Sequence, residues 1–438
     1  MKKRFAIPLS IYLAAAFVYL LSLGGQSQSR GFTEHYGNHY VHLAESFLHG
    51  QLHTLGDKAP SGNDFAEYKG HWYVTFPPFP AVVILPVVAV FGQHTPDRIF
   101  WALMAALAPA LLFVLLRRLR EQARSGRSLK EDLGLCALFA FGTVFYFTAV
   151  QGSVWFASHI VASSLLILYL LWALDARKPM LAGLALILAF LCRPTTALLG
   201  LFFVFEVLRS STKDTATLAD CDHASWLRRL RRHFGVIDFR VVLNKFVLFS
   251  IPVAVFSVLI MWMNWARFDN PFEFGHSYLH IRWVDRITRY GLFSYHFFPK
   301  HLAIFVASLP WILPVAPYFQ ISGHGLALWF STPNLLALLW PKCMSGTMVA
   351  LYLSSALVAV INLCYQNSGW LQFGHRFALD YMPVLFLLLA LSGRRFGKGF
   401  IALAVVSIAI NTFGALTFER AWEFYHIDPS QSIIFQPD

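Results

Sequence analysis

The residues of this sequence that could do chemistry are charged side chains set in or beside long apolar segments. Arg193, Arg376 and Asp380 fall in this setting. A charge at the centre of a bilayer costs about 2.5–3.5 kcal/mol on insertion scales, so such residues are candidates for function. The planar guanidinium group of arginine can bind a phosphate through two parallel hydrogen bonds. Two structural alternatives stay open: Arg376 could pair with Asp380 four residues later on one helix, and Arg193 could extend to the membrane surface.

Carboxylates and aromatic rings alternate in residues 34–80. Such a mixture suits a sugar, whose C–H groups stack on rings and whose hydroxyls bond to acids. The same rings are also typical of an aromatic belt at a membrane surface. Histidines are concentrated in the same part of the chain, and of seventeen only His223 and His233 fall in segments that we assign to the cytoplasm. A metal site is one interpretation, and a hydrated interface is the other.

The composition predicts the elements that must position these residues. Of 438 residues, 57% are hydrophobic and only 13% charged, against about 25% charged in soluble domains. This excludes a disordered chain, a collagen-like chain and a small disulfide-linked domain. A spanning helix needs about 20 mostly apolar residues. We therefore predict an all-α polytopic membrane protein with about eleven transmembrane helices, at 5–24, 97–116, 133–150, 156–174, 181–192, 195–208, 246–265, 332–341, 347–363, 377–392 and 400–417.

The distribution of Lys and Arg predicts the orientation. Basic residues concentrate in 117–132 and 209–245, which the positive-inside rule assigns to the cytoplasm. To keep both loops there, 79–91 must lie along the outer interface, and 181–208 must be a helical hairpin that turns at Arg193-Pro194. The net charge of +12 then reflects orientation, so we predict no nucleic-acid partner. The N-terminus is expected in the cytoplasm and the C-terminus outside.

This topology predicts a single integral membrane domain over 1–438. Its expected parts are the anchor helix 1–24, a first extracytoplasmic loop 25–95 with juxtamembrane helices, helices 2–7 in 96–265, a second extracytoplasmic loop 266–331, and helices 8–11 with an outer tail in 332–438.

Several short motifs fall within this architecture. They are Tyr40-x-x-x-Ala44 ending near Gly50, the Tyr68-x-Gly70-x-x-Tyr73 step, Pro77-Pro78-Phe79-Pro80, Leu191-x-Arg193-Pro194, and Arg376-Phe377-x-x-Asp380-x-x-Pro383. In these motifs and in topology over the whole chain, the sequence resembles the C-type (GT-C) membrane glycosyltransferases, related to the bacterial mannosyl- and arabinosyl-transferase-like families.

The resemblance implies an enzyme of the bacterial inner membrane that acts in building cell-envelope glycans. It implies transfer of a sugar from a polyprenyl-phosphate donor to a hydroxyl of a glycan, lipid or protein acceptor at the extracytoplasmic face. It also implies that Arg193 and Arg376 bind the donor phosphate. Many members of the class carry an acid at a position that is Tyr36 in this sequence. The nearest acid is Glu34, two residues earlier. Glu34 and then Asp64 are therefore the predicted catalytic bases.

Further polar residues near the same face are predicted to bind substrate. They are Asn38, Glu67, His159, Glu273, His276, His375 and Asp380. The sequence identifies no particular cofactor, and a divalent metal is an open alternative because members of the class differ in their need for one. Two other functions also remain open: a lipid or glycolipid transporter or flippase, and an enzyme like the O-antigen polymerases and ligases.

Overall fold

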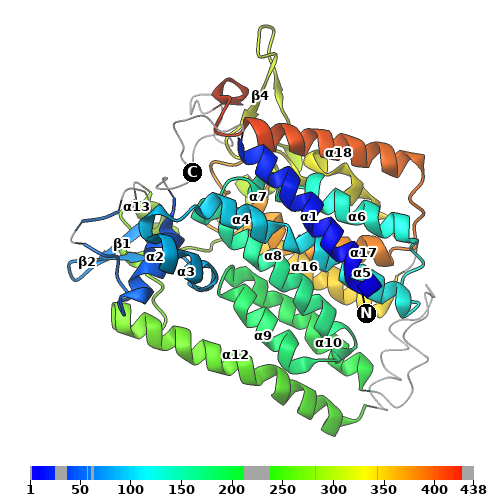
Figure 1. Cartoon of the computed structure of the whole chain (residues 1–438), viewed down its shortest axis with the longest axis horizontal. Helices are drawn as coiled ribbons and strands as arrows, with labels where there is room; N and C mark the ends of the chain where they lie inside the picture. Colours follow the sequence, from blue (N-terminus) through cyan, green and yellow to red (C-terminus); the bar gives the residue numbers. More distant parts are fainter. Residues whose placement is uncertain are drawn as a thin grey trace.

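The chain folds into a mostly helical structure, for which we have a computed structural model (Figure 1). It describes residues 2–24, 37–56, 58–60, 64–211, 237–281, 283–342 and 344–426. The longer helices are α1 (Lys2–Gly24), α4 (Asp97–Ala105), α5 (Leu107–Glu121), α6 (Leu129–Phe141), α8 (Val154–Ala173), α9 (Pro179–Phe190), α10 (Gly200–Ser210), α12 (Phe239–Phe268), α16 (Gly346–Leu363), α17 (Met382–Leu391) and α18 (Lys398–Thr417). The shorter ones are α2 (His39–Leu48), α3 (Phe79–Phe91), α7 (Val144–Ala149), α13 (Val284–Tyr290), α14 (Phe298–Ala307) and α15 (Leu328–Ser331).

Six helical segments in the described part of the chain are long and apolar enough to cross a membrane. They are Phe5–Leu23, Asp97–Glu121, Val154–Ala176, Phe239–Phe268, Gly346–Leu363 and Lys398–Thr417. These segments indicate an integral membrane protein. The other predicted spans form shorter helices, so the count of about eleven stays a prediction.

Local sequence features explain why some predicted spans form shorter helices. The predicted span 133–150 is divided where Gly142 ends α6 and the Thr143 side chain caps α7 by accepting from the Phe145 N–H. The predicted span 332–341 is a 3₁₀ helix, η5 (Pro333–Leu339).

Residues 179–210 form a helical hairpin. Helix α9 ends at Phe190, Arg193 and Pro194 make the turn, and the chain returns through η3 (Pro194–Leu199) and α10. Arg209, near the end of α10, forms ion pairs with Asp175, which precedes α9, and with Glu206 at 2.8 Å. Arg193 therefore lies at the opposite end of the hairpin from this ion-pair cluster.

Two small sheets lie at the end of the molecule where Arg193 is found. In the first, β1 (Phe65–Tyr68) pairs antiparallel with β2 (His71–Val74). Lys69 and Gly70 join them at φ values of 52° and 77°, as a tight two-residue hairpin requires. In the second, β4 (Phe319–Ser322) pairs with β3 (Trp311–Ile312) and with β5 (Tyr425–His426).

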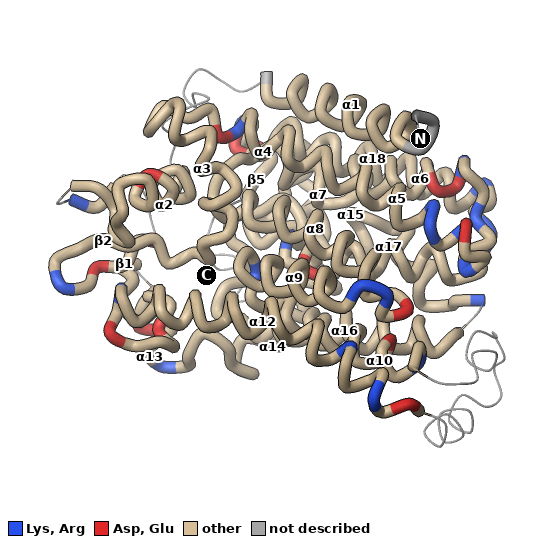
Figure 2. Tube along the Cα trace, turned by 60° about the horizontal axis from the view of Figure 1, so that its bottom comes forward, with Lys and Arg blue, Asp and Glu red and all other residues tan. Residues whose placement is uncertain are grey.

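Charge is concentrated at the two ends of the bundle. Figure 2 shows Lys and Arg together with Asp and Glu at both ends of the bundle, and fewer charged residues between the ends. At the end that holds the α5–α6 connection, Arg124 lies 2.9 Å from Asp175 and donates to Thr347 Oγ1 at 3.0 Å. These contacts bring the starts of α9 and α16 to the same end as the basic connection. A large cluster of buried apolar side chains fills the middle of the bundle.

Candidate functional site

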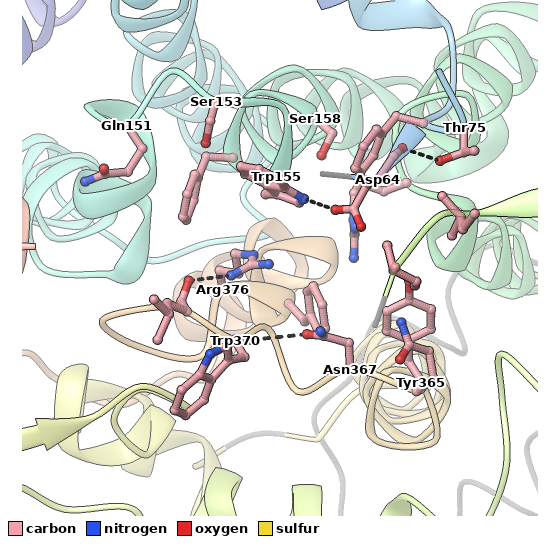
Figure 3. A pocket seen from close by; sticks show the side chains of 18 of the residues that line it. Asp64, Thr75, Gln151, Ser153, Trp155, Ser158, Tyr365, Asn367, Trp370 and Arg376 are labelled. Carbon is pink, nitrogen blue, oxygen red and sulfur yellow. Dashed lines mark hydrogen bonds between the residues drawn. The ribbon is translucent and has the colours of Figure 1, made fainter. Parts of the chain in front are cut away.

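A cavity of about 420 Å³ lies at the end of the bundle that carries the two sheets. This volume is within the usual range for small-molecule sites. Distant segments line it: the residue before β1, the start of α8, the tip of the α9–α10 hairpin, the loop after α12, and residues 365–377. In Figure 3, Asp64 and Trp155 lie on one wall, Tyr365, Asn367 and Trp370 lie on the facing wall, and Arg376 lies between them.

Asp64 is an acidic residue of the cavity lining. It precedes β1 with a φ of 68°, a conformation that Asp tolerates better than most residues. Trp155 Nε1 donates to Asp64 Oδ2 at 2.8 Å. Burial raises the pKa of Asp64, and the Trp155 hydrogen bond and the charge of Arg376 oppose part of this rise. Burial thus destabilises the ionised form of Asp64, and Trp155 provides one fixed hydrogen-bond donor to it.

Arg193 is held against a buried carboxylate behind the cavity wall. Its Nε and Nη2 each donate to Asp380 at 3.0 Å. Asp380, fully buried, also accepts from Thr195 Oγ1 at 2.8 Å and Asn362 Nδ2 at 3.1 Å. His159 Nδ1 lies 3.1 Å from its Oδ1. Asp380 is therefore the centre of a buried polar cluster that orients Arg193.

The alternative of an Arg376–Asp380 pair is not what the structure contains. Residues 376–380 form the 3₁₀ helix η6 (Arg376–Asp380), in which three residues make one turn. Residues four apart therefore point in different directions, and Asp380 bonds to Arg193 instead. The guanidinium group of Arg193 is directed toward Asp380.

Arg376 also lines the cavity. Its Nη1 donates to the carbonyl oxygens of Gly369 and, at 3.1 Å, Leu371. Its guanidinium carbon lies 5.0 Å from the ring centre of Phe156 and 5.2 Å from that of Phe377. Two arginines that are 183 positions apart by their numbers thus reach one cavity with Asp64.

The other predicted site residues have different surroundings. His276 lines the cavity, and burial lowers the pKa of its imidazole. His159 and His375 are buried behind the wall, where both rings pack near Phe377. Neither belongs to the cavity lining given by the described residues.

Three predicted substrate-binding residues take part in local structure outside that lining. Asn38 is buried at the start of α2. Glu67 Oε2 lies 3.1 Å from His280 Nε2. Glu273 accepts from the Ser277 hydroxyl at 2.7 Å and from the Gly275 N–H at 2.6 Å. Glu34, the first predicted base, lies outside the described residues.

Sequence reasoning missed two charged residues of the cavity, Arg98 and Glu419. Both lie at the edge of an apolar segment, which is the signal that could have identified them. Gly152 makes room for Arg98: a Cβ on this glycine would lie 2.4 Å from Arg98 Cγ, and its φ of 78° also favours glycine. Aromatic side chains complete the wall, among them Trp283, Tyr365, Trp370 and Trp422.

The described residues contain no group of three or more His, Cys, Asp or Glu side chains placed to hold a metal ion. Such a site was an open alternative in the sequence.

Comparison with known proteins gives one distant likeness. No family profile and no curated protein matches the sequence. The fold is similar to a crystal structure of the oligosaccharyltransferase of Archaeoglobus fulgidus in the apo form, with a TM-score of 0.44 and 14% sequence identity. The alignment covers 98% of this chain and 57% of that one. The chain thus spans a little over half the length of that protein.

Proposed function

We propose that this protein is a membrane glycosyltransferase that moves a sugar from a polyprenyl-phosphate donor to an acceptor hydroxyl at the extracytoplasmic face. The observation that carries this proposal is the joining of Asp64, Arg193 and Arg376 in one cavity of about 420 Å³. A carboxylate can take a proton from a hydroxyl, and arginines can stabilise the charge of a departing phosphate.

In the proposed reaction the acceptor oxygen attacks the anomeric carbon of the donor sugar. The bond between that carbon and the phosphate oxygen breaks, and its electron pair leaves with the polyprenyl phosphate. Asp64 accepts the hydroxyl proton. The hydrogen bond from Trp155 to Asp64 Oδ2 (2.8 Å) holds one carboxylate oxygen, so the other oxygen, Oδ1, is the one that takes the proton.

The two arginines have different parts in this proposal. Asp380 holds Nε and Nη2 of Arg193, so Nη1 is the nitrogen that would bind the phosphate. Arg376 is held through its own Nη1 by the carbonyls of Gly369 and Leu371. Groups fixed before the substrate arrives stabilise developing charge without having to reorganise.

Aromatic rings support a sugar as the transferred group. Trp155, Trp283, Tyr365 and Trp370 contribute to the cavity lining. Indole and phenol rings offer large apolar faces as well as polar groups that bind hydroxyls. The extracytoplasmic location is supported by the basic α5–α6 connection, which lies at the other end of the bundle.

Glu34 remains the alternative base, and paired variants would distinguish it from Asp64. The test uses the purified full chain in lipid nanodiscs with radiolabelled polyprenyl-phosphate sugars, and it measures transfer and hydrolysis separately. We expect Asp64→Asn to lower kcat by about 100-fold or more, as the loss of a general base typically does, with donor binding unchanged. Normal turnover in Asp64→Asn together with loss in Glu34→Gln would move the role to Glu34.

The same assay tests the reaction class. Cleavage of the sugar–phosphate bond supports a transferase. In proteoliposomes of the same protein, movement of intact donor across the bilayer without cleavage would refute the transferase proposal in favour of a flippase. Activity only with a diphosphate-linked glycan would indicate a polymerase or ligase.

A further inference from the structure

The hairpin formed by β3 and β4 exposes an apolar tip. We refer to residues 309–322 as the apolar hairpin. Its tip includes Ile312, Val315 and Tyr318, which are 84%, 66% and 66% exposed. The sequence contains no Asp, Glu, Lys or Arg from Leu302 to Pro341. A protruding loop in water normally carries polar or charged residues, so this tip is unusual for an aqueous surface.

The backbone of the tip is suited to leaving water. Pro310, Pro314 and Pro317 have no N–H group. The N–H of Leu313 donates to the Tyr318 carbonyl and that of Tyr318 to the Val315 carbonyl, both at 2.8 Å. Because unsatisfied backbone donors are what makes irregular chain costly in lipid, these features lower the penalty of insertion.

The apolar hairpin is continuous with a helix face that is exposed to lipid. Phe319, the cross-strand partner of Ile312, packs against Phe413 of α18 with ring centres 5.5 Å apart. Helix α18 is one of the six candidate spans, and only 22% of its apolar window is buried within the protein. Figure 1 shows the hairpin projecting across the direction of α18, near the C-terminal end of that helix. A segment that projects across the helix axes from this end runs along the membrane surface.

We propose that the apolar hairpin inserts its tip into the adjacent leaflet of the bilayer, at the boundary between headgroups and acyl chains. The occupant of this surface is the lipid itself. The edge of β3 still carries backbone groups that need polar partners, which fits the headgroup boundary better than the hydrocarbon centre. Tyr318 is a residue type enriched at that depth. The proposal does not depend on the reaction proposed above.

The chain that follows β4 connects this membrane contact to the cavity wall. His324 Nδ1 lies 2.6 Å from Ser368 Oγ, and the N–H of Leu326 donates to the Phe373 carbonyl at 2.9 Å. Residues 368–373 include Trp370 and Leu371, which line the cavity. A hairpin embedded in the leaflet would therefore fix this wall relative to the membrane surface.

Depth-dependent fluorescence tests the proposal. An environment-sensitive fluorophore is attached at Val315→Cys in the full chain, with Cys221, Cys343 and Cys364 replaced by Ser, and the protein is placed in phosphatidylcholine nanodiscs. The matched control is Lys69→Cys at the tip of the β1–β2 hairpin, which is polar and also exposed. We expect spin-labelled lipid to quench the Val315 label severalfold more than the Lys69 label, and aqueous iodide to show the reverse order.

Ile312→Cys provides a second labelling position, so that poor folding of one variant does not end the test. Equal iodide quenching at positions 315 and 69 would overturn the proposal, because the tip would then lie in water. Protection from iodide without lipid quenching, together with cross-linking between position-315 cysteines of two copies, would also overturn it by showing that a second protein molecule covers the tip.

Discussion

At the scale of single residues, the candidate site depends on how each charge is held. Asp64 has one indole donor, whereas Asp380 has Arg193, Thr195 and Asn362 as donors. A carboxylate with many donors is stabilised as an ion and is a poor base, while one with few donors in a buried place accepts a proton more readily. This contrast supports a chemical part for Asp64 and a positioning part for Asp380.

The first residue-scale prediction concerns Trp155→Phe. Burial raises the pKa of Asp64 and the Trp155 hydrogen bond lowers it, so loss of that bond should raise the pKa further. Ionised Asp64 is the proposed base and activity appears as pH rises through its pKa. The acidic limb of kcat/KM should therefore move to higher pH, as measured in a pH–rate profile.

Trp370→Phe is the matched control for Trp155→Phe. Trp370 lines the same cavity, but its ring packs against His324 at 4.7 Å between centres. This variant should change the rate without moving the acidic limb. A limb that stays in place or moves to lower pH in Trp155→Phe would contradict the assignment of Asp64 as base.

The second prediction concerns Asp380→Ala, which removes the fully buried partner of Arg193, whose side chain is 20% exposed. Breaking a buried ion pair from one side costs about 3–5 kcal/mol of folding stability. We expect a loss of this size in thermal or denaturant unfolding. Glu67→Ala is the control: its contact with His280 is largely exposed, with side-chain exposures of 40% and 59%, and its loss should change stability by about 1 kcal/mol or less. Similar losses in the two variants would refute the structural role of Asp380.

At the scale of elements, most of the loop 366–376 has no regular structure, so side-chain hydrogen bonds must hold its conformation. Gln372 makes such bonds. Its Nε2 donates to the carbonyls of His324 and Ser368 at 2.8 and 2.9 Å, and its Oε1 accepts from the Arg376 N–H at 3.0 Å. The side chain is fully buried. Gln372 is thus a positioning residue for Arg376 and Trp370.

The element-scale prediction is that Gln372→Glu, which keeps the shape but removes both donated bonds, lowers kcat more than it raises KM for the donor. Each buried carbonyl left without its donor costs about 1–3 kcal/mol, so the melting temperature should fall as well. Gln320→Ala serves as the control, because Gln320 donates to the Glu423 carbonyl at an exposed position. A fall in stability with kcat unchanged would show that Gln372 supports the fold without positioning Arg376.

At the scale of the whole molecule, the two ends of the bundle differ in their charged residues, and the cavity lies at one of them. One end holds basic connections and the Arg124, Asp175 and Arg209 ion pairs, and the other holds the sheets and the cavity. The positive-inside rule places the basic end in the cytoplasm. The cavity would then open toward the extracytoplasmic side.

This orientation predicts the outcome of cysteine labelling. Lys69→Cys, in the β1–β2 turn, should react with a membrane-impermeant maleimide in spheroplasts, whereas Lys130→Cys, an exposed position at the start of α6, should react only after lysis. The parent chain with accessible native cysteines replaced is the control. Labelling of position 130 in intact spheroplasts, with position 69 protected, would reverse the orientation and move the proposed chemistry to the cytoplasm.

The sequence by itself determined the helical, membrane-embedded character of the chain and the turn at Arg193-Pro194. These features follow from local causes: apolar residues must leave water, backbone groups in lipid must bond within their own helix, and proline interrupts a helix. It also indicated Asp64, Arg193, Arg376 and His276, because charged or polar residues stand out beside apolar segments.

The partners of those residues were decided only by the tertiary structure. Arg193 meets Asp380 across 187 positions, and Trp155 meets Asp64 across 91. Arg98 and Glu419 join the cavity from two further segments. Such contacts depend on how helices pack side by side, and helix packing is set by the summed shape of many apolar side chains. The pattern of polarity along one chain marks which residues are unusual, while the packing of the bundle selects which of them share a site.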